Sequence, residues 1–411
     1  MHYARHADAV VRKLARMFGS VLVTGARQVG KTTLVSNVIE NMGGGVGFVT
    51  LDDKLQLAIA KRDSATFLKD NPPPVFIDEA QYAPELFPEI KISLDRSRKK
   101  GQFFLSGSQP LEMMENVSES LAGRIGILNL SGLSLRELSG ATCTDVFLPT
   151  EDYFAERSRE RVAVPYAEVW NAIHRGAFPE LCANPDFDWQ MFHAAYTKTY
   201  IERDVRKLAQ VADEVKFTQF MTVVAARTAQ LLNLASLARD VGISQPTAER
   251  WLSVMVTSNL VYLLRPYHNN ITKRTVKTPK LYFLDTGLAA YLTRWNTADV
   301  MRNGAMAGAF FETFVIGEIV KSYNNRGILN LPLYFYRDRD GTEIDLLIED
   351  GGTLYPIEIK KRAEPKISDA DTFRVLAKLP DIKRGTGGVV CLYERLATLA
   401  DGIRSIPVTM L

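Results

Sequence analysis

Short apolar runs alternate with helical patterns through the first third of the chain. The runs at residues 21–23, 46–51, 74–77 and 103–105 are only a few residues long, which is typical of strands buried on both faces. Residues 8–18 instead repeat apolar positions at the spacing of an α-helix. Strands that alternate with helices in this way predict an α/β domain with a parallel sheet and flanking helices.

A glycine-rich loop follows the first of these strands and leads directly into a helical pattern. Its sequence is GARQVGKT, and this strand–loop–helix context is what a phosphate-binding loop requires. Gly25 and Gly30 allow the backbone to point its N–H groups at a phosphate. Lys31 can then reach the β- and γ-phosphates, and the hydroxyl of Thr32 can coordinate Mg²⁺. We therefore expect the nucleotide to contact Gly25, Ala26, Arg27, Gln28, Val29, Gly30, Lys31, Thr32 and Thr33.

The run at residues 74–77 ends in two carboxylates, Asp78 and Glu79. A buried parallel strand delivers such acids to the carboxyl edge of the sheet, where ligands of open α/β sheets bind. We expect Asp78 to hold Mg²⁺ together with Thr32, and Glu79 to orient or deprotonate the attacking water. The alternative for an acidic pair here is a solvated turn or a helix cap. With the glycine-rich loop upstream, the pair predicts a nucleoside triphosphatase.

A further predicted strand ends in hydroxyl groups instead of acids. Ser106 and Ser108 follow residues 103–105, and a small polar group at this place can lie between the γ-phosphate and the catalytic water. Either serine is therefore a candidate nucleotide sensor. The alternative, an ordinary Ser/Gly turn, fits the spacing equally well.

The composition of the chain narrows the class of protein. Its 411 residues suffice for two to four domains, and 50 basic against 47 acidic residues give a net charge of +3. Any DNA contact must therefore come from a local patch. Three separated cysteines fit a reducing compartment, and no apolar run approaches the ~18 residues of a membrane span. We expect a soluble, cytoplasmic protein with no membrane contact.

Several motifs occur in an order that resembles a known family. In chain order they are GARQVGKTTL, LDD, PVFIDEAQYAPELFPEIKISLD, GQFFLSGSQ and SESLAGRI. This order resembles bacterial and archaeal AAA-type P-loop ATPases that carry a second domain of uncharacterised function, and the resemblance extends over nearly the whole chain. It implies ATP as the nucleotide and Arg124 as a charge-stabilising finger or sensor. Arg124 could instead form a surface salt bridge; if it acts on a neighbouring copy, a homo-oligomer is required.

Residues 150–295 predict a helical region that contains a winged helix at about 228–285. A short helix ends at Gly242, and Ser244 caps a second helix with Pro246 in its first turn. Two apolar runs that follow predict the strands of the wing. The segment between them, residues 265–280, carries five Lys or Arg residues and no acid. This favours contact with the DNA backbone, although winged helices also serve as protein-interaction or lid modules.

Residues 300–411 contain a second set of chemical groups. Asp345 lies on an alternating strand, and a hairpin brings it beside Glu358 and Lys360, which share one face of the next strand. Glu312, at the edge of an apolar helical stripe, offers a third acid, and Glu318 is its rival. Carboxylates that hold Mg²⁺ or Mn²⁺ beside a lysine suit phosphodiester hydrolysis.

The spacing of these residues resembles the PD-(D/E)xK nuclease fold, except that no proline precedes Asp345. The resemblance implies Asp345 as second acid, Glu358 and Lys360 as the E-x-K pair, and Glu312 as the helix acid. The alternative is an inactive nuclease fold that serves in docking.

We thus predict three modules: an AAA-type P-loop domain at 1–140, a helical and winged-helix region at 150–295, and an α/β nuclease-like domain at 300–411. The leading hypothesis is a Mg²⁺-dependent ATPase that acts on DNA, with Lys31, Glu79 and Arg124 as its catalytic residues. A second is a nucleotide-dependent switch that assembles on a protein partner. A third is a nuclease that the ATPase licenses.

Overall fold

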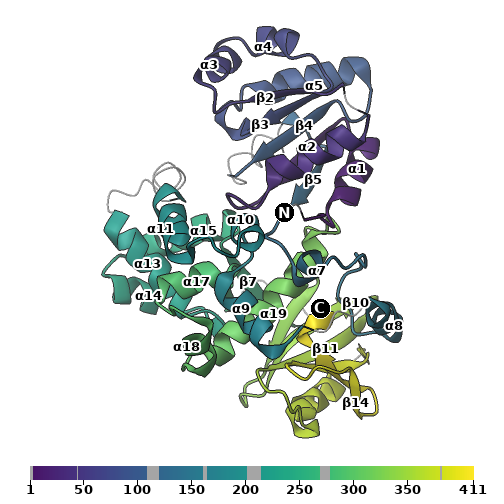
Figure 1. The fold of residues 1–411 in the computed structure, drawn as a ribbon, viewed down its shortest axis with the longest axis vertical. Helices are drawn as coiled ribbons and strands as arrows, with labels where there is room; N and C mark the ends of the chain where they lie inside the picture. The colour runs from purple at the N-terminus through teal and green to yellow at the C-terminus, as the bar shows by residue number, and fades with distance from the viewer. Residues whose placement is uncertain are drawn as a thin grey trace.

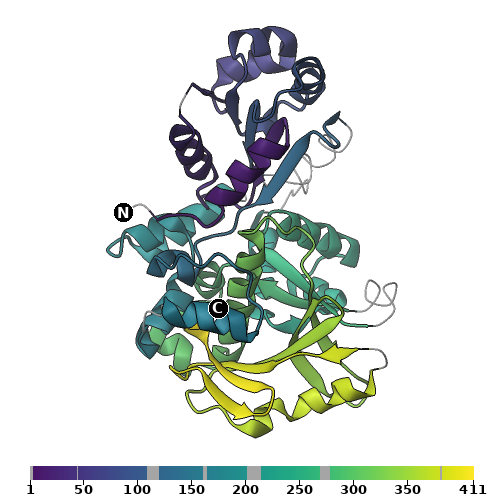
Figure 2. The ribbon, with the colours of Figure 1, turned by 90° about the vertical axis from the view of Figure 1, so that its right-hand side faces the viewer.

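The computed structural model describes residues 3–43, 45–108, 120–160, 164–200, 214–268, 278–379 and 382–411. The described chain forms an N-terminal part built on one sheet and a larger part built on a second sheet, with the amino terminus near the junction between them (Figure 1). Figure 2 shows the same division from the side. A parallel sheet with flanking helices, followed by a mixed-sheet region, confirms the predicted α/β class.

The N-terminal sheet is parallel throughout, in the order β2-β3-β4-β1-β5. Alternate residues of the central strand β1 face opposite layers, because Val21 and Val23 pack in one apolar core and Leu22 in another. Helices therefore cover both faces (Figure 1). The elements are β1 Ser20–Thr24, β2 Gly47–Thr50, β3 Val75–Asp78, β4 Phe103–Gly107, β5 Ile125–Asn129, α1 Asp8–Met17, α2 Lys31–Asn41, α3 Lys54–Arg62, α4 Ser64–Asp70, η1 Ala80–Tyr82 and α5 Leu86–Ser97.

Helices dominate the middle of the described chain. They pack into a large apolar core that also contains buried residues of the C-terminal sheet. Their bounds are α7 Leu135–Ser139, α8 Glu151–Arg159, α9 Tyr166–Arg175, α10 Pro179–Ala183, α11 Trp189–Tyr200, α13 Glu214–Ala226, α14 Leu234–Val241, α15 Gln245–Thr257, α17 Thr286–Leu292 and α18 Ala298–Asn303.

Two helices and an antiparallel hairpin form in the region predicted as a winged helix, and the winged helix itself stays a prediction. Gly242 ends α14 in the left-handed conformation, and the Ser244 side chain accepts a hydrogen bond from the backbone N–H of Thr247 at the start of α15. Strands β7 (Val261–Pro266) and β8 (Lys280–Phe283) pair antiparallel, and β8 also pairs with β6 (Gln230–Leu231). Residues 269–277 of the basic segment lie outside the described residues.

The C-terminal sheet continues the sheet of this hairpin. β7 pairs parallel with β9, so the regions predicted as separate modules on either side of residues 295–300 share hydrogen-bonded strands. The C-terminal elements are α19 Ala307–Asn324, β9 Leu333–Arg337, β10 Glu343–Asp350, β11 Thr353–Lys360, η3 Ile367–Lys378, β12 Lys383–Arg384, β13 Gly387–Cys391, β14 Ala397–Ala400, β15 Ile403–Pro407 and η4 Val408–Met410.

The end of the chain returns to the middle helices. Arg136 of α7 donates a hydrogen bond to the carbonyl of Leu411 at 2.6 Å, and the hydroxyl of Tyr153 on α8 donates to that of Met410 at 2.7 Å. Figure 1 accordingly places the carboxyl terminus near α7 and α8. Within the described ranges, no helix has both the length and the apolar character needed to cross a membrane.

Candidate functional site

The glycine-rich loop joins β1 to α2 and depends on unusual backbone angles. Gly25 has φ 147° and Gly30 has φ 92°, values that side chains with a Cβ rarely adopt. A Cβ on Gly25 would lie 2.1 Å from the carbonyl oxygen of Leu130. The loop therefore takes this path only with glycine at position 25.

Lys31, Thr32, Ser106 and Asp78 all form hydrogen bonds within the predicted site. Lys31 Nζ donates to the carbonyls of Gly25 at 3.1 Å and Ala26 at 2.8 Å. The hydroxyl of Thr32 donates to Oδ2 of Asp78 at 3.0 Å, and Ser106 donates to the other oxygen of the same carboxylate. A hydroxyl in contact with a carboxylate is an oxygen donor set that fits Mg²⁺.

The second acid, Glu79, is held in a strained conformation. Its φ of 54° and ψ of 42° lie in the left-handed region, which is uncommon for residues other than glycine. Oε2 of Glu79 accepts a hydrogen bond from Gln81 Nε2, and Ser108 Oγ lies 3.5 Å from it. The sequence analysis did not single out Gln81, although it stands two residues after Glu79 in the same stretch of sequence.

These groups come together because of the order of the strands. β4 lies between β1 and β3 and is parallel to both. The loop after β1, the acids after β3 and the serines at the end of β4 therefore meet at one edge of the sheet.

A large cavity opens beside this edge. Its volume is about 1230 Å³, and it lies between the glycine-rich loop and the segment of α10 and α11. Lys31, Thr32 and Glu79 line one side, and Phe187 and Met191 line the other. A space of this size accommodates a nucleotide. The remaining lining residues are Arg27, Gln28, Gly30, Thr33, Pro179, Glu180, Asp186, Asp188, Phe192, Ala195, Tyr196 and Thr199.

Arg124 does not lie at this site within its own chain. It immediately precedes β5, whose first residue Ile125 pairs with Ser20 at the start of β1. It is therefore at the opposite edge of the sheet, about 16 Å away along five residues of β1. Its guanidinium forms an ion pair with Asp95, with nitrogen–oxygen distances of 2.6 and 3.1 Å, and both side chains are substantially exposed.

The C-terminal candidates Asp345, Glu358 and Lys360 lie together on neighbouring strands. Leu346 pairs with Ile357 in the β10–β11 hairpin, a register that brings Asp345 beside Glu358. Lys360 Nζ lies 2.6 Å from Glu358 Oε2 and 3.3 Å from Asp345 Oδ2. Asp345 Oδ2 also accepts the N–H of Ile359, and Glu358 Oε1 accepts the hydroxyl of Thr372 at 2.7 Å.

The helix acid Glu312 has different partners. Its Oε1 accepts hydrogen bonds from Lys280 at 3.1 Å and from the hydroxyl of Tyr282 at 2.7 Å. Lys280 also lies 2.5 Å from Glu343, so strand β8 supplies a cation to this group. The rival acid Glu318 lies elsewhere, because its carboxylate binds Lys321 and the backbone N–H of Leu135.

Burial and crowding alter the acidity of these carboxylates. Burial, followed by the charge of Asp345, raises the pKa of Glu358 to about 8, against the opposing effect of Lys360. The same two causes raise the pKa of Glu312, against the opposing effect of Lys280. Among the described residues, no three histidine, cysteine, aspartate or glutamate side chains converge as a metal site. Asp345 and Glu358 by themselves remain a carboxylate pair that fits a hard divalent cation.

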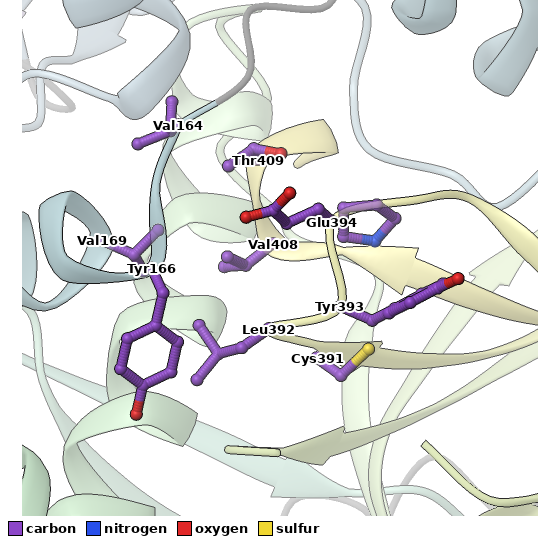
Figure 3. A pocket seen from close by; sticks show the side chains of 10 residues that line it. Val164, Tyr166, Val169, Cys391, Leu392, Tyr393, Glu394, Val408 and Thr409 are labelled. Carbon is purple, nitrogen blue, oxygen red and sulfur yellow. The ribbon is translucent and has the colours of Figure 1, made fainter. Parts of the chain in front are cut away.

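A second, much smaller cavity lies at the carboxyl ends of β13 and β15 (Figure 3). Val164 and Val169 face it from one side, and Leu392 and Val408 from the other. Its volume is about 20 Å³, which is enough for one or two water molecules. It is therefore too small to bind a substrate.

Three stretches of the chain match known domain families. Residues 18–139 match a family described as AAA domain, residues 166–299 a domain of unknown function (DUF8612), and residues 307–411 another domain of unknown function (DUF4143). Together with the glycine-rich loop and the acids beside it, the first match supports an AAA-type P-loop ATPase domain in the N-terminal part.

Relatives are similar to this chain over most of its length. Uncharacterized proteins of Mycobacterium bovis and Mycobacterium tuberculosis are each 29% identical over 404 residues, which are 98% of this chain and 83% of the relative. A solved Walker-type ATPase of Pyrococcus abyssi is 16% identical, with 70% of this chain and 94% of that chain covered and a TM-score of 0.42. The Thermotoga maritima RuvB Holliday junction branch migration motor is 17% identical, with 62% and 86% covered and a TM-score of 0.30. TM-scores below 0.5 do not establish a shared overall arrangement.

Proposed function

We propose that this protein is a Mg²⁺-dependent ATPase whose hydrolysis is coupled to the binding or processing of DNA. The observation that carries the ATPase part is the 3.0 Å contact between Thr32 and Asp78, beside a cavity that Lys31 and Glu79 line. A phosphate-binding loop, a pair of metal-binding oxygens and a carboxylate base thus border one space.

Each group has a defined role in the proposed reaction. Lys31 and the N–H groups of the loop stabilise the negative charge that develops on the transferred phosphoryl group. Glu79 accepts a proton from the attacking water. Thr32 and Asp78 would hold the Mg²⁺ ion, which supplies positive charge beside the phosphate oxygens when it is bound.

The coupling to DNA rests on the α14–α15 helix pair and the β7–β8 hairpin. Arg265 on β7 is exposed, and residues 265–280 have five basic residues and no acid in sequence. The last of the five, Lys280, is buried in ion pairs with Glu312 and Glu343, so it does not count toward this contact. A basic segment that follows a capped second helix in sequence supports contacts with the phosphate backbone of a duplex. β7 and β9 share hydrogen bonds. A DNA contact that displaced β7 would therefore also displace the C-terminal sheet.

A second candidate function, metal-dependent cleavage of a phosphodiester, is favoured by the contact of Lys360 with both Asp345 and Glu358. The two carboxylates would hold Mg²⁺ or Mn²⁺, and Lys360 would steady the nucleophile or the leaving group. The competing role of this domain is docking without catalysis.

We propose further that Arg124 acts on a neighbouring copy of the chain. Its place at the opposite edge of the sheet puts the nucleotide of its own chain out of reach. A homo-oligomer in which one copy presents Arg124 to the cavity of the next would provide a guanidinium fork for the phosphate charge.

The experiment that tests the ATPase proposal measures ATP hydrolysis by the full chain in Mg²⁺, with and without linear, single-stranded and four-way DNA. We expect turnover that DNA stimulates and that Lys31→Ala abolishes. Unchanged turnover in Lys31→Ala would overturn the P-loop assignment. Hydrolysis that ignores every DNA would instead favour a nucleotide-dependent switch that assembles on a protein partner.

The same preparations serve to test cleavage. We expect Mn²⁺-dependent cutting of one of these DNAs to disappear in Asp345→Ala. Cleavage that survives this substitution would exclude the C-terminal carboxylates as its source, and no cleavage at all would favour the docking role.

A further inference from the structure

We infer that Gln81 is a positioning residue of the ATPase site, which holds the carboxylate of Glu79 in the orientation that it needs to react with water. The inference rests on the proposed ATPase function and adds a residue that acts through Glu79, not on the nucleotide itself.

The first support is the pair of donors on one carboxylate oxygen. Gln81 lies in η1, directly after β3, and is only 5% exposed. Its Nε2 donates to Oε2 of Glu79, and it also lies 3.5 Å from the hydroxyl of Ser108. Ser108, at the end of β4, is 3.5 Å from the same oxygen of Glu79. Among the contacts of the described residues, anchoring therefore uses Oε2 and leaves Oε1 for the attacking water.

The second support is the backbone of Glu79. Its left-handed conformation fixes the direction in which the side chain leaves the strand, and Glu79 lines the cavity that Lys31 and Thr32 also line. A base that is restrained at both its backbone and its carboxylate needs little reorganisation when the reaction begins.

The third support is the unfavourable free energy of burying the amide oxygen of a glutamine at position 81. The amide oxygen Oε1 of Gln81 is buried and has no hydrogen-bond partner within the part of the chain that the structure describes. An unsatisfied buried acceptor is unfavourable, so an apolar side chain of the same length would suit this place better if packing were the only requirement. The donor half of the amide explains why a glutamine is present.

The variant Gln81→Met tests the inference, because it keeps the length of the side chain and removes the donor. We expect kcat for ATP to fall by about 10- to 100-fold, as misplacement of a catalytic group does, while KM and nucleotide binding change by less than about twofold. The matched control is Gln102→Met, since the amide of Gln102 donates to the carbonyl of Lys100 in an exposed turn before β4, away from Glu79. This control should keep the full kcat.

A double-mutant cycle separates positioning from a structural role. In a Glu79→Gln background, Gln81→Met should change the residual kcat by less than about twofold, because the carboxylate that Gln81 holds is already gone. Equal losses in both backgrounds, or full kcat in Gln81→Met alone, would overturn the inference.

Two further measurements keep the test decisive. If Gln81→Met does not fold, Ser108→Ala provides the test, because it removes the second and longer contact with Glu79. We expect kcat to fall in this variant, but by less than in Gln81→Met. Full kcat in Ser108→Ala would then overturn the inference. A wild-type protein that hydrolyses no ATP would refute the proposed function itself, and this inference with it.

Discussion

At both candidate sites, the residues around a glutamate determine the chemistry that its carboxylate can carry out. Glu79 and Glu358 are both glutamates at the carboxyl end of a strand. Glu79 lines a large cavity and is held by neutral donors. Glu358 is buried beside a second carboxylate and a lysine. The first environment suits a base for a bound substrate, and the second suits a group that exchanges a proton for a metal ion.

Replacing Glu79 by glutamine should separate nucleotide binding from hydrolysis. Glu79→Gln keeps the size of the side chain and removes the proton acceptor, so we expect kcat to fall by at least about 100-fold. Nucleotide affinity should stay within about threefold, because Lys31 and the loop N–H groups are intact. Equilibrium binding of a fluorescent ATP analogue, beside steady-state hydrolysis, measures both. Hydrolysis at the wild-type rate would assign the base to another residue.

The raised pKa of Glu358 should make metal binding depend on pH. A carboxyl whose pKa is about 8 in the folded protein, against 4.5 ordinarily, contributes stability below pH 4.5 that is lost as the pH rises through 8. A divalent cation must displace this proton, so we expect Mn²⁺ affinity to rise by up to about tenfold per pH unit between pH 6 and 8. Thermal unfolding titrated with Mn²⁺ at both pH values measures this rise.

The matched control for this titration is Asp345→Asn, which keeps the shape of the site and removes one carboxylate. It should bind Mn²⁺ weakly at either pH, because one of the two carboxylates that would hold the ion is gone. Equal affinity of the wild-type protein at pH 6 and pH 8 would contradict the predicted exchange of a proton for the metal.

At the scale of elements, each motif works because one strand end is placed beside another. The glycine-rich loop closes over the end of β1 only because Gly25 passes against the backbone at Leu130, just after β5. Asp78 at the end of β3 accepts a hydrogen bond from Thr32 after β1, and β4, which lies between the two strands, contributes Ser106 to the same carboxylate. Loop and sheet are therefore a single structural unit.

A methyl group at Gly25 should break this unit. Gly25→Ala places a Cβ 2.1 Å from the Leu130 carbonyl at a φ of 147°, so the loop must move and its N–H groups lose their common direction. We expect loss of detectable ATP binding and a lower melting temperature. The matched control is Gly308→Ala in helix α19, where the added methyl meets no described atom within 4 Å beyond its chain neighbours and the backbone of its own helix. It should bind ATP normally, and a Gly25→Ala variant that did the same would disprove this account.

At the scale of the whole molecule, Arg5 connects the phosphate-binding loop to the rest of the chain. Its guanidinium donates to the carbonyls of Val29 at 2.8 Å and Ser131 at 2.7 Å, and pairs with Glu137 at 2.9 Å. Burial opposes ionisation of Glu137, but Arg5 and the N–H of Ser134 outweigh it and lower the pKa of this carboxyl. The neighbouring residue Leu135 in turn donates to Glu318 of α19, so the loop is tied to the C-terminal part.

Removal of Arg5 should therefore destabilise the whole protein. The side chains of Arg5 and Glu137 are 7% and 0% exposed, and breaking a buried pair leaves an uncompensated charge that costs about 3–5 kcal/mol. We expect Arg5→Met to lower the free energy of unfolding by about that amount, as measured by urea denaturation.

The exposed pair of Arg12 and Asp8 provides the control for this measurement. Its side chains are 28% and 32% exposed, so Arg12→Met should lower the free energy of unfolding by about 0.5 kcal/mol or less. Similar losses in both variants would show that Arg5 contributes no more than a surface ion pair does.

Several features could be predicted from local sequence because their causes are local. The strands at residues 21–23, 74–77 and 103–105 are short apolar runs, and the capped helix after Ser244 and the turn at Gly242 follow from side-chain and backbone preferences. The pairing of Glu358 with Lys360 followed from the period of a strand. The hydrogen bond from Gln81 to Glu79 could not be predicted. It depends on a one-turn helix and on Ser108, which comes from another strand.

The sequence by itself thus determined the phosphate-binding-loop motif, the α/β class and the charged residues proposed for each site, since these depend on motifs and periodicity within short windows. Only the tertiary structure decided which of those residues meet. In the folded chain, Asp345 lies beside Glu358 and Lys360. Glu312 instead binds Lys280, and Glu318 accepts a hydrogen bond from Leu135. Arg124 lies at the opposite edge of its sheet, paired with Asp95. The physical reason is that strand order and the packing of distant segments are collective properties of the buried core, which no local pattern specifies.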